Sequence, residues 1–138
     1  MREIDKIILH CTATYPDSYV TVGTIDKWHR KRGWQNGIGY HYVIYKNGEI
    51  HKGRDIDIIG AHTKGQNKTS IGVAYVGGID DQGVPRDTMT IEQETSWLQL
   101  VNSLRTVFGY CTVHGHNEFS SKACPSFNVQ DKYKFLNI

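Results

Sequence analysis

The C-terminal third of the sequence holds several side chains that could bind a metal ion. His114, His116, Lys122 and Cys124 fall within the short stretch 114–124. Zinc readily takes imidazole nitrogen and thiolate sulfur as ligands, and a catalytic zinc has three protein ligands and an open position for water. This stretch can supply two of the three ligands. The third must therefore come from a distant part of the chain.

His10 is the obvious candidate for that third ligand. It follows the apolar run Ile7-Ile8-Leu9, which is typical of a buried strand. A lone histidine in an apolar strand is more often a hydrogen-bonded core residue, so the residues alone leave both roles open. They also leave open the choice between His114 and His116, because residues two apart share one face of an extended segment.

The three cysteines differ in their surroundings. An odd number of cysteines does not indicate a disulfide framework, so free thiols are expected. Alternation along a strand turns His10 to one face and Cys11 to the other. Cys11 and Cys111 are expected to be buried apolar residues. Cys124 follows polar residues and precedes a proline, which predicts a loop position from which a thiolate could reach a metal.

The length and charge of the chain narrow the class of protein. A length of 138 residues fits one domain without a second module. The 16 basic and 14 acidic side chains give a net charge of +2 and form no block of like charge, so no nucleic-acid partner is expected. No apolar stretch of about 18 residues predicts a membrane span, and the N-terminus has no pattern of a signal peptide.

Local patterns in the first half predict a strand, a helix and a hairpin. The strand covers residues 4–11. The helix covers 22–32 and ends at Gly33, with Val22, Ile25, Trp28 and His29 on one face. Strands over 41–46 and 49–54 flank Asn47-Gly48, a dipeptide favoured in two-residue type I′ hairpin turns.

The second half continues the alternation of strands and helices. Residues 70–76 predict a central buried strand. Thr90 and Gln93 match a capping box, and the helix that they open ends at Gly109. A short strand over 110–114 leads to the His/Cys segment, and a last helix follows Asn128. Because the hairpin requires antiparallel pairing, we expect one α/β domain with a mixed central sheet of about five or six strands, flanked by about three helices.

Seven motifs, in order from about residue 4 to residue 130, resemble the T7-lysozyme-type N-acetylmuramoyl-L-alanine amidases. The animal peptidoglycan recognition proteins are similar in outline. The resemblance covers nearly the whole chain, so it is far more specific than any single motif. The motifs are His10-Cys-Thr-Ala-Thr, Trp28-His-Arg-Lys-Arg-Gly-Trp34, Gly39-Tyr-His-Tyr42, Gly53-Arg-Asp55, Gly60-Ala-His-Thr-Lys-Gly-Gln-Asn67, Ser70-Ile-Gly-Val73 and Lys122-Ala-Cys-Pro-Ser-Phe127.

The resemblance implies one zinc ion per chain, bound by His10, His116 and Cys124, with His114 outside the ligand set. It implies a single zinc-dependent amidase domain over residues 1–138. The expected reaction is hydrolysis of the amide bond between N-acetylmuramic acid and L-alanine in peptidoglycan. Zinc suits this reaction because it makes water more nucleophilic and polarises the scissile carbonyl.

The resemblance also implies a catalytic pair, Tyr40 and Lys122. Tyr40 would hold or deprotonate the attacking water, and Lys122 would stabilise the tetrahedral oxyanion. The residues alone favour a different interpretation, in which Tyr40 is one of eight tyrosines packed in a core and Lys122 is a solvated surface charge.

Four further residues in matching segments could contact sugar or stem peptide: Trp34, Arg54, His62 and Asn67. The planar guanidinium of Arg54 suits a carboxylate, although Asp55 could simply pair with it. His29 and His51 have no evident partner and are expected on a helix flank and a strand surface.

The expected biological role is that of a phage or prophage endolysin. Such a protein is cytoplasmic on synthesis, acts on the cell wall after release through a separate membrane pore, and is expected to be a monomer. The alternatives are a bacterial cytosolic recycling enzyme and a peptidoglycan-binding protein without catalysis. T7 lysozyme also inhibits its phage RNA polymerase, so a polymerase partner is implied by analogy alone.

Overall fold

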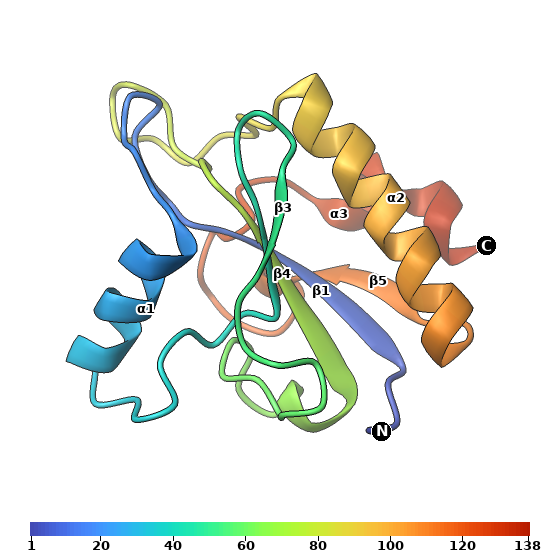
Figure 1. Ribbon diagram of the computed structural model, residues 1–138. Helices are drawn as coiled ribbons and strands as arrows, with labels where there is room; N and C mark the ends of the chain where they lie inside the picture. Colours follow the sequence, from blue (N-terminus) through green and yellow to red (C-terminus); the bar gives the residue numbers. More distant parts are fainter.

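A five-stranded sheet with strand order β3-β2-β4-β1-β5 lies at the centre of the computed structural model, which describes residues 1–138 (Figure 1). The strands β1, β2, β4 and β5 are parallel to one another, and β3 is antiparallel to β2. The predicted mixed sheet is therefore confirmed. The strands are β1 (Lys6–Cys11), β2 (Tyr42–Ile44), β3 (Ile50–Lys52), β4 (Ser70–Tyr75) and β5 (Thr112–Gly115).

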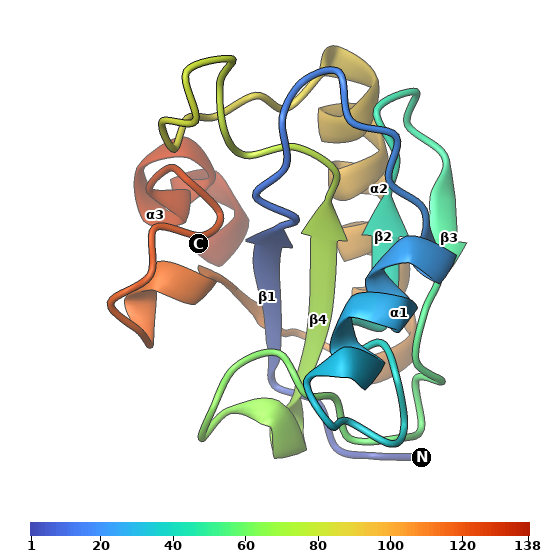
Figure 2. The same cartoon turned by 90° about the vertical axis from the view of Figure 1, so that its left-hand side faces the viewer.

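Three α-helices cover the two faces of the sheet. Figure 2 shows α1 in front of the sheet on the side of β4 and β2, with α2 behind it. Short 3₁₀ helices occupy Asn67–Thr69, His116–Glu118 and Lys134–Asn137. None of the helices has the length and apolar character needed to cross a bilayer. The α-helices are α1 (Val22–Lys31), α2 (Ile91–Phe108) and α3 (Val129–Lys132).

The larger apolar core lies between the sheet and the helices α2 and α3. Ile7, Leu9 and Cys11 of β1 point into this core. Strand alternation therefore directs Ile8 and His10 to the opposite face, as predicted. That face is only partly covered by the smaller core under α1, so polar side chains remain near its centre. Cys111 also lies in the larger core, and all three cysteines are free.

The helix α2 begins where the sequence places it. Thr90 and Gln93 form the predicted capping box. Gln93 is fully buried, and its amide donates hydrogen bonds to the carbonyl oxygens of Ile44 (3.1 Å) and Val76 (3.0 Å). The helix ends at Gly109, whose φ of 82° favours glycine. The start of α2 is thus fixed to the carboxyl ends of β2 and β4.

The hairpin between β2 and β3 is confirmed, but its turn is not the predicted type I′. Gly48 has a φ of 90°, whereas Asn47 has no positive φ. The N–H of Gly48 donates to the carbonyl of Tyr45, and the N–H of Tyr45 donates to Glu49, both at 2.8 Å. This pattern is a three-residue loop with a type I turn and a bulge at glycine, which needs only one left-handed residue.

The first helix also departs from its predicted face. Ile25 and His29 are buried, but Trp28 is 38% exposed. The difference arises because the buried face of α1 is narrow: it packs on a small core rather than on a full sheet face. His29 therefore belongs to the interior, in agreement with its place on the predicted helical face and not with the exposed flank expected for it.

His41 is a buried histidine that joins two loops to β4. Its Nδ1 accepts a hydrogen bond from the N–H of Gly72 (3.1 Å), and its Nε2 lies 2.8 Å from the carbonyl oxygen of Ile58. The Arg2 guanidinium lies 3.2 Å from the same nitrogen. Burial, helped by Arg2, lowers the pKa of His41 to about 4. The ring is therefore neutral at neutral pH.

We expect the metal-free protein to become less stable as the pH falls from 7 to 5. An unfolded histidine titrates near about 6.5, whereas native His41 resists protonation until its pKa of about 4. Between these values the unfolded chain binds more protons, so the free energy of unfolding falls as the pH is lowered. Urea unfolding at several pH values measures the loss, and an NMR titration assigns it. A His41 ring that titrates near its unfolded pKa would contradict this account.

Candidate functional site

The parallel register of β1 and β5 places two histidines side by side. Leu9 pairs with Gly115, so the residues that follow them, His10 and His116, lie together at the carboxyl ends of their strands. Their ring centroids are 4.6 Å apart. Ligand sites in open α/β sheets form at such strand ends.

Cys124 joins the two histidines from the loop that follows. Its Sγ lies 3.7 Å from Nδ1 of His10 and accepts a hydrogen bond from the N–H of Cys11 at 3.2 Å. The ligand atoms of His10, His116 and Cys124, here called the donor triad, all lie within 4.8 Å of one another. Ligands bonded at about 2.0–2.3 Å to a tetrahedral zinc ion are about 3.3–3.8 Å apart. The triad therefore fits a zinc ion after a small contraction.

The electrostatics of the donor triad also favour a cation. Burial, together with His62 and His116, lowers the pKa of His10 well below its usual range, and burial and Lys122 lower the pKa of His116. Both rings are thus neutral and can offer a lone pair. Contact with Cys11 and burial raise the pKa of the Cys124 thiol, so its proton is lost only when a cation takes its place.

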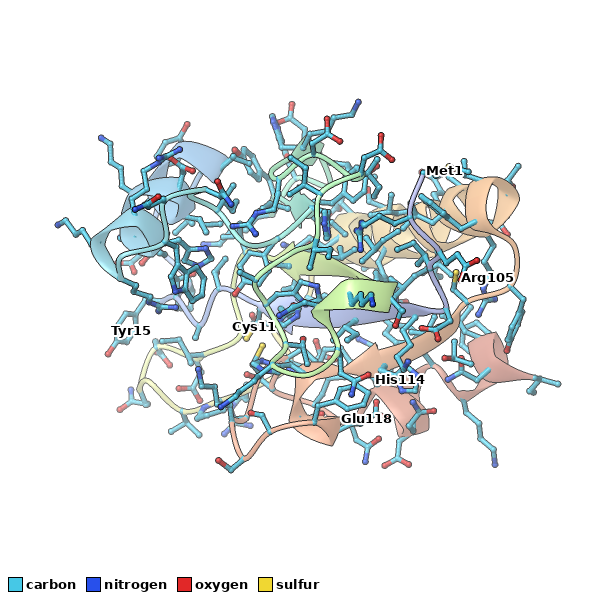
Figure 3. All side chains as sticks on the ribbon, turned by 90° about the horizontal axis from the view of Figure 1, so that it is seen from below. Met1, Cys11, Tyr15, Arg105, His114 and Glu118 are labelled. Atoms are coloured by element: carbon cyan, nitrogen blue, oxygen red, sulfur yellow. The ribbon has the colours of Figure 1, made fainter.

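His114 lies outside the donor triad. Its Nε2 is 2.8 Å from the hydroxyl of Thr112, and its Nδ1 is 2.9 Å from the carboxylate of Glu118, which also accepts from the N–H of Gly115. Figure 3 shows His114 and Glu118 side by side. His114 and His116 do not share a face because β5 ends at Gly115, where the chain turns into a 3₁₀ helix.

A cleft of about 480 Å³ opens beside the donor triad. Its walls come from the end of α1, the loop 61–67 and the segment 116–122. The basic side chains of Arg32, Lys64 and Lys122 line it, and no acidic side chain does. The cleft thus combines a candidate metal centre with a positive lining.

Both predicted catalytic residues lie in this cleft. The Tyr40 ring is 5.0 Å from the His10 ring, and its hydroxyl makes no hydrogen bond to another residue. Burial raises the pKa of Tyr40 above its usual value, so it is a neutral phenol. Lys122 is exposed at the rim and forms no ion pair. Tertiary folding therefore brings together five residues that the resemblance assigned to one site.

Three of the four predicted substrate contacts line the cleft, but Arg54 does not. The Arg54 guanidinium donates to the carbonyl oxygens of Gly37 (3.2 Å), Ile38 (3.0 Å) and Ile59 (2.9 Å). Asp55 forms no ion pair with it and instead accepts from the N–H of Asp57 at 2.9 Å. The donors of Arg54 hold two loops together, so its expected role in binding a substrate carboxylate stays a prediction that the cleft lining does not support.

His62 and Asn67 line the cleft but also make contacts within the protein. Nδ1 of His62 lies 2.9 Å from Nε2 of His10, and burial lowers the pKa of His62 to about 3. The side-chain oxygen of Asn67 accepts from the N–H groups of His62 (3.0 Å) and Thr63 (2.9 Å). Asn67 thus fixes the backbone of the loop that carries His62.

His29 is a cleft residue that the sequence reasoning missed. Its Nδ1 accepts from the N–H of Gly39 at 2.8 Å, and its ring packs against Trp34 and Tyr40. Burial lowers the pKa of His29 to about 4. The spacing of four residues between Ile25 and His29 indicated that His29 is buried. It could not indicate that the end of α1 borders a cleft.

Replacing Asn67 tests whether it acts on the loop or on substrate. Asn67→Ala removes one acceptor from two backbone N–H groups, so we expect it to lower the free energy of unfolding by about 1–3 kcal/mol. Asn67→Asp keeps the acceptor and should stay close to wild type. Chemical denaturation measures both variants. An Asn67→Ala protein with unchanged stability and a raised KM would instead identify Asn67 as a substrate contact.

Known proteins resemble this chain over most of its length. Residues 1–127 match the family Amidase_2, described as N-acetylmuramoyl-L-alanine amidase. The endolysin of Escherichia phage T7 is 40% identical over 126 residues, which are 91% of this chain and 83% of the relative. A peptidoglycan-recognition protein of Drosophila melanogaster is 29% identical over 139 residues, covering 97% of this chain and 75% of the relative.

A solved structure agrees with these relatives. The N-acetylmuramoyl-L-alanine amidase LysC from Clostridium intestinale URNW superposes with a TM-score of 0.81 and 29% identity, covering 96% of this chain and 87% of the other. The residues that match the family, 1–127, include all three members of the donor triad. The chain therefore belongs to the N-acetylmuramoyl-L-alanine amidases of the phage endolysin type, hydrolases that act on peptidoglycan.

Proposed function

We propose that this amidase depends on one zinc ion, bound by His10, His116 and Cys124. The observation that carries the proposal is the donor triad itself: two neutral imidazoles and a cysteine sulfur, within 4.8 Å of one another beside the cleft. Two imidazoles and one thiolate leave a zinc centre with a formal charge of +1 and room for a further ligand. A bound zinc ion would supply Lewis acidity, which polarises a carbonyl and lowers the pKa of water.

Tyr40 is proposed to hold the attacking water by a hydrogen bond. Its ring packs beside His10, and its hydroxyl has no protein partner, so it can bond to a molecule in the cleft. In the metal-free protein, burial raises the pKa of Tyr40, so its hydroxyl is a neutral phenol that can donate a hydrogen bond to the water. Of the two roles that the resemblance implies for Tyr40, holding the water is the one proposed.

Lys122 is proposed to stabilise the oxyanion that forms when the amide carbonyl is attacked. A cation placed where negative charge develops stabilises a tetrahedral intermediate without further rearrangement. Lys122 lines the cleft next to His116 and is not neutralised by an acidic partner. Its ammonium group is therefore available to the substrate.

Substrate binding is proposed along the remaining cleft wall. Trp34 lines the cleft, packs edge-on against His29 and lies 5.6 Å from the guanidinium carbon of Arg32. An aromatic ring supported in this way offers a flat apolar surface to a sugar or peptide. Arg32 and Lys64 add positive charge that suits the carboxylates of a stem peptide.

The endolysin role is proposed over the alternatives. The T7 endolysin is a close relative in sequence, which favours action on the cell wall after release over cytosolic recycling. A peptidoglycan binder without catalysis is disfavoured because Cys124, Tyr40 and Lys122 are all present around one cleft. The monomeric state and the polymerase partner remain predictions.

Removal of any member of the donor triad should abolish tight zinc binding and activity. We expect this of His10→Ala, His116→Ala and Cys124→Ser, because two remaining ligands cannot hold the ion. His114→Ala is the matched control and should keep both metal and activity, since its ring bonds to Thr112 and Glu118. Metal analysis of purified protein, with mass spectrometry of digested muropeptides, measures both. Loss of zinc from His114→Ala together with retention by His116→Ala would refute the ligand assignment.

Tyr40→Phe and Lys122→Ala should each reduce turnover by about 10²-fold or more, the scale of a lost proton-transfer or oxyanion contact. Zinc content and thermal midpoint should change little, because neither residue belongs to the donor triad. The rate of release of L-alanine N-termini from peptidoglycan measures the effect. Near wild-type turnover by both zinc-loaded variants would show that these residues are not catalytic.

A further inference from the structure

The His10 ring is engaged at both of its nitrogens. Nδ1 faces the Cys124 sulfur at 3.7 Å, which is the side of the donor triad. Nε2 faces away from it, 2.9 Å from Nδ1 of His62 and 3.2 Å from the hydroxyl of Thr63. A neutral imidazole carries one hydrogen, so a ring that binds a cation through Nδ1 carries that hydrogen on Nε2. The hydrogen must then be donated to a group behind the metal site.

We propose that His62 is a positioning residue, which accepts the Nε2–H hydrogen bond of His10 and so fixes the ring and tautomer with which His10 binds zinc. This inference rests on the proposed zinc dependence. Hydrogen-bond acceptors behind a metal-bound histidine orient the ring and strengthen it as a ligand. His62 therefore acts on the metal through His10 and makes no contact with the reacting atoms.

The surroundings of His62 are consistent with this tautomer. Because Nδ1 of His62 accepts, its hydrogen lies on Nε2, where the nearest partner is the hydroxyl of Ser70 at 3.4 Å. The Thr63 hydroxyl oxygen lies 3.2 Å from Nε2 of His10 and 2.9 Å from Nδ1 of His62, so it can share the Nε2–H of His10 as a second acceptor. The hydrogen bonds thus run inward from His10 to Ser70, a fully buried residue of β4.

The position of the His62 ring is fixed by close packing. A Cβ atom at Gly72 of β4 would lie 2.5 Å from Cδ2 of His62, and a Cβ atom at Gly60 would lie 2.7 Å from the same carbon. Any other residue at either site would push the ring out of place. The backbone of His62 is held by Asn67, as described above. The fold therefore provides a rigid support behind His10.

This arrangement leaves His62 little to offer a substrate. It lines the cleft, but its two ring nitrogens already contact His10 and Ser70 within the protein. A residue that bound substrate would present a free donor or acceptor to the cleft. The role of His62 is thus distinguishable by experiment from the substrate contact expected from the sequence.

Two substitutions separate the hydrogen bond from the bulk of the ring. His62→Leu removes the acceptor and keeps an apolar side chain in the space, whereas the side-chain oxygen of His62→Asn lies near the position of Nδ1. His51→Leu, on β3, is the matched control away from the cleft. Zinc affinity of each metal-free protein is measured by competition with a chelator, after thermal unfolding has shown that it is folded. We expect His62→Leu to weaken zinc binding by about 10- to 100-fold and His62→Asn to restore it to within about threefold.

Cobalt(II) spectra and steady-state kinetics give two further readouts. The ligand-field spectrum of the cobalt protein should change in His62→Leu and return in His62→Asn, because it reports the ligand geometry at His10. At saturating zinc, His62→Leu should lower kcat with little change in KM. If His62→Leu does not fold, His62→Gln replaces it, because its oxygen reaches beyond the Nδ1 position and should also weaken zinc binding.

Several outcomes would overturn the proposal. Wild-type zinc affinity in His62→Leu would show that the hydrogen bond does not support the metal site. A raised KM with unchanged zinc affinity would make His62 a substrate contact. Equal losses in His62→Leu and His62→Asn would assign the effect to ring bulk alone. Failure of the wild-type protein itself to bind zinc would instead refute the proposed zinc dependence, so the two failures are distinct.

Discussion

The parallel pairing of β1 with β5 is the constraint on which the site depends. It sets Leu9 opposite Gly115, and the two histidines that follow become neighbours although more than a hundred residues separate them. One face of β1 is buried in the larger core under α2, and the apolar side chains of that face stabilise the central strand. A shift of register by one residue would turn His10 into the apolar core and remove it from the site.

On the opposite face of the sheet, burial of the His10 imidazole is unfavourable unless hydrogen bonds from the loops compensate for it. His10 is 1% exposed, and a buried imidazole needs partners for both nitrogens. The loop 60–67 brings His62 and Thr63 to one nitrogen, and the donor triad occupies the other. Gly72 of β4 leaves the space in which His62 lies. The metal site thus depends on the packing of this face, because Gly72 leaves room for His62, and His62 in turn contacts the proposed ligand His10.

In the cleft, the neutral side chains lie at the base and the charged side chains lie at the rim. At its base, burial keeps His29 and Tyr40 uncharged, which preserves their capacity to donate and accept hydrogen bonds. At its rim, Arg32, Lys64 and Lys122 remain solvated cations. Such a gradient suits a substrate with an amide at the reacting centre and anionic groups further out. No acidic side chain lines the cleft, so none competes with the donor triad for a cation.

The sequence by itself determined the elements and most of the chemistry. Periodicity and caps placed the strands and α2, because these signals are local, and the resemblance assigned the donor triad, Tyr40 and Lys122 to one site. Only the tertiary structure decided what depends on contacts between distant segments. His62 lies 52 residues from His10 in sequence, and Arg54 reaches carbonyls up to 17 residues away. The type of the hairpin turn could not be predicted from local sequence, because Asn47-Gly48 is compatible with more than one loop length. The pairing of β2 with β3 selects among these lengths.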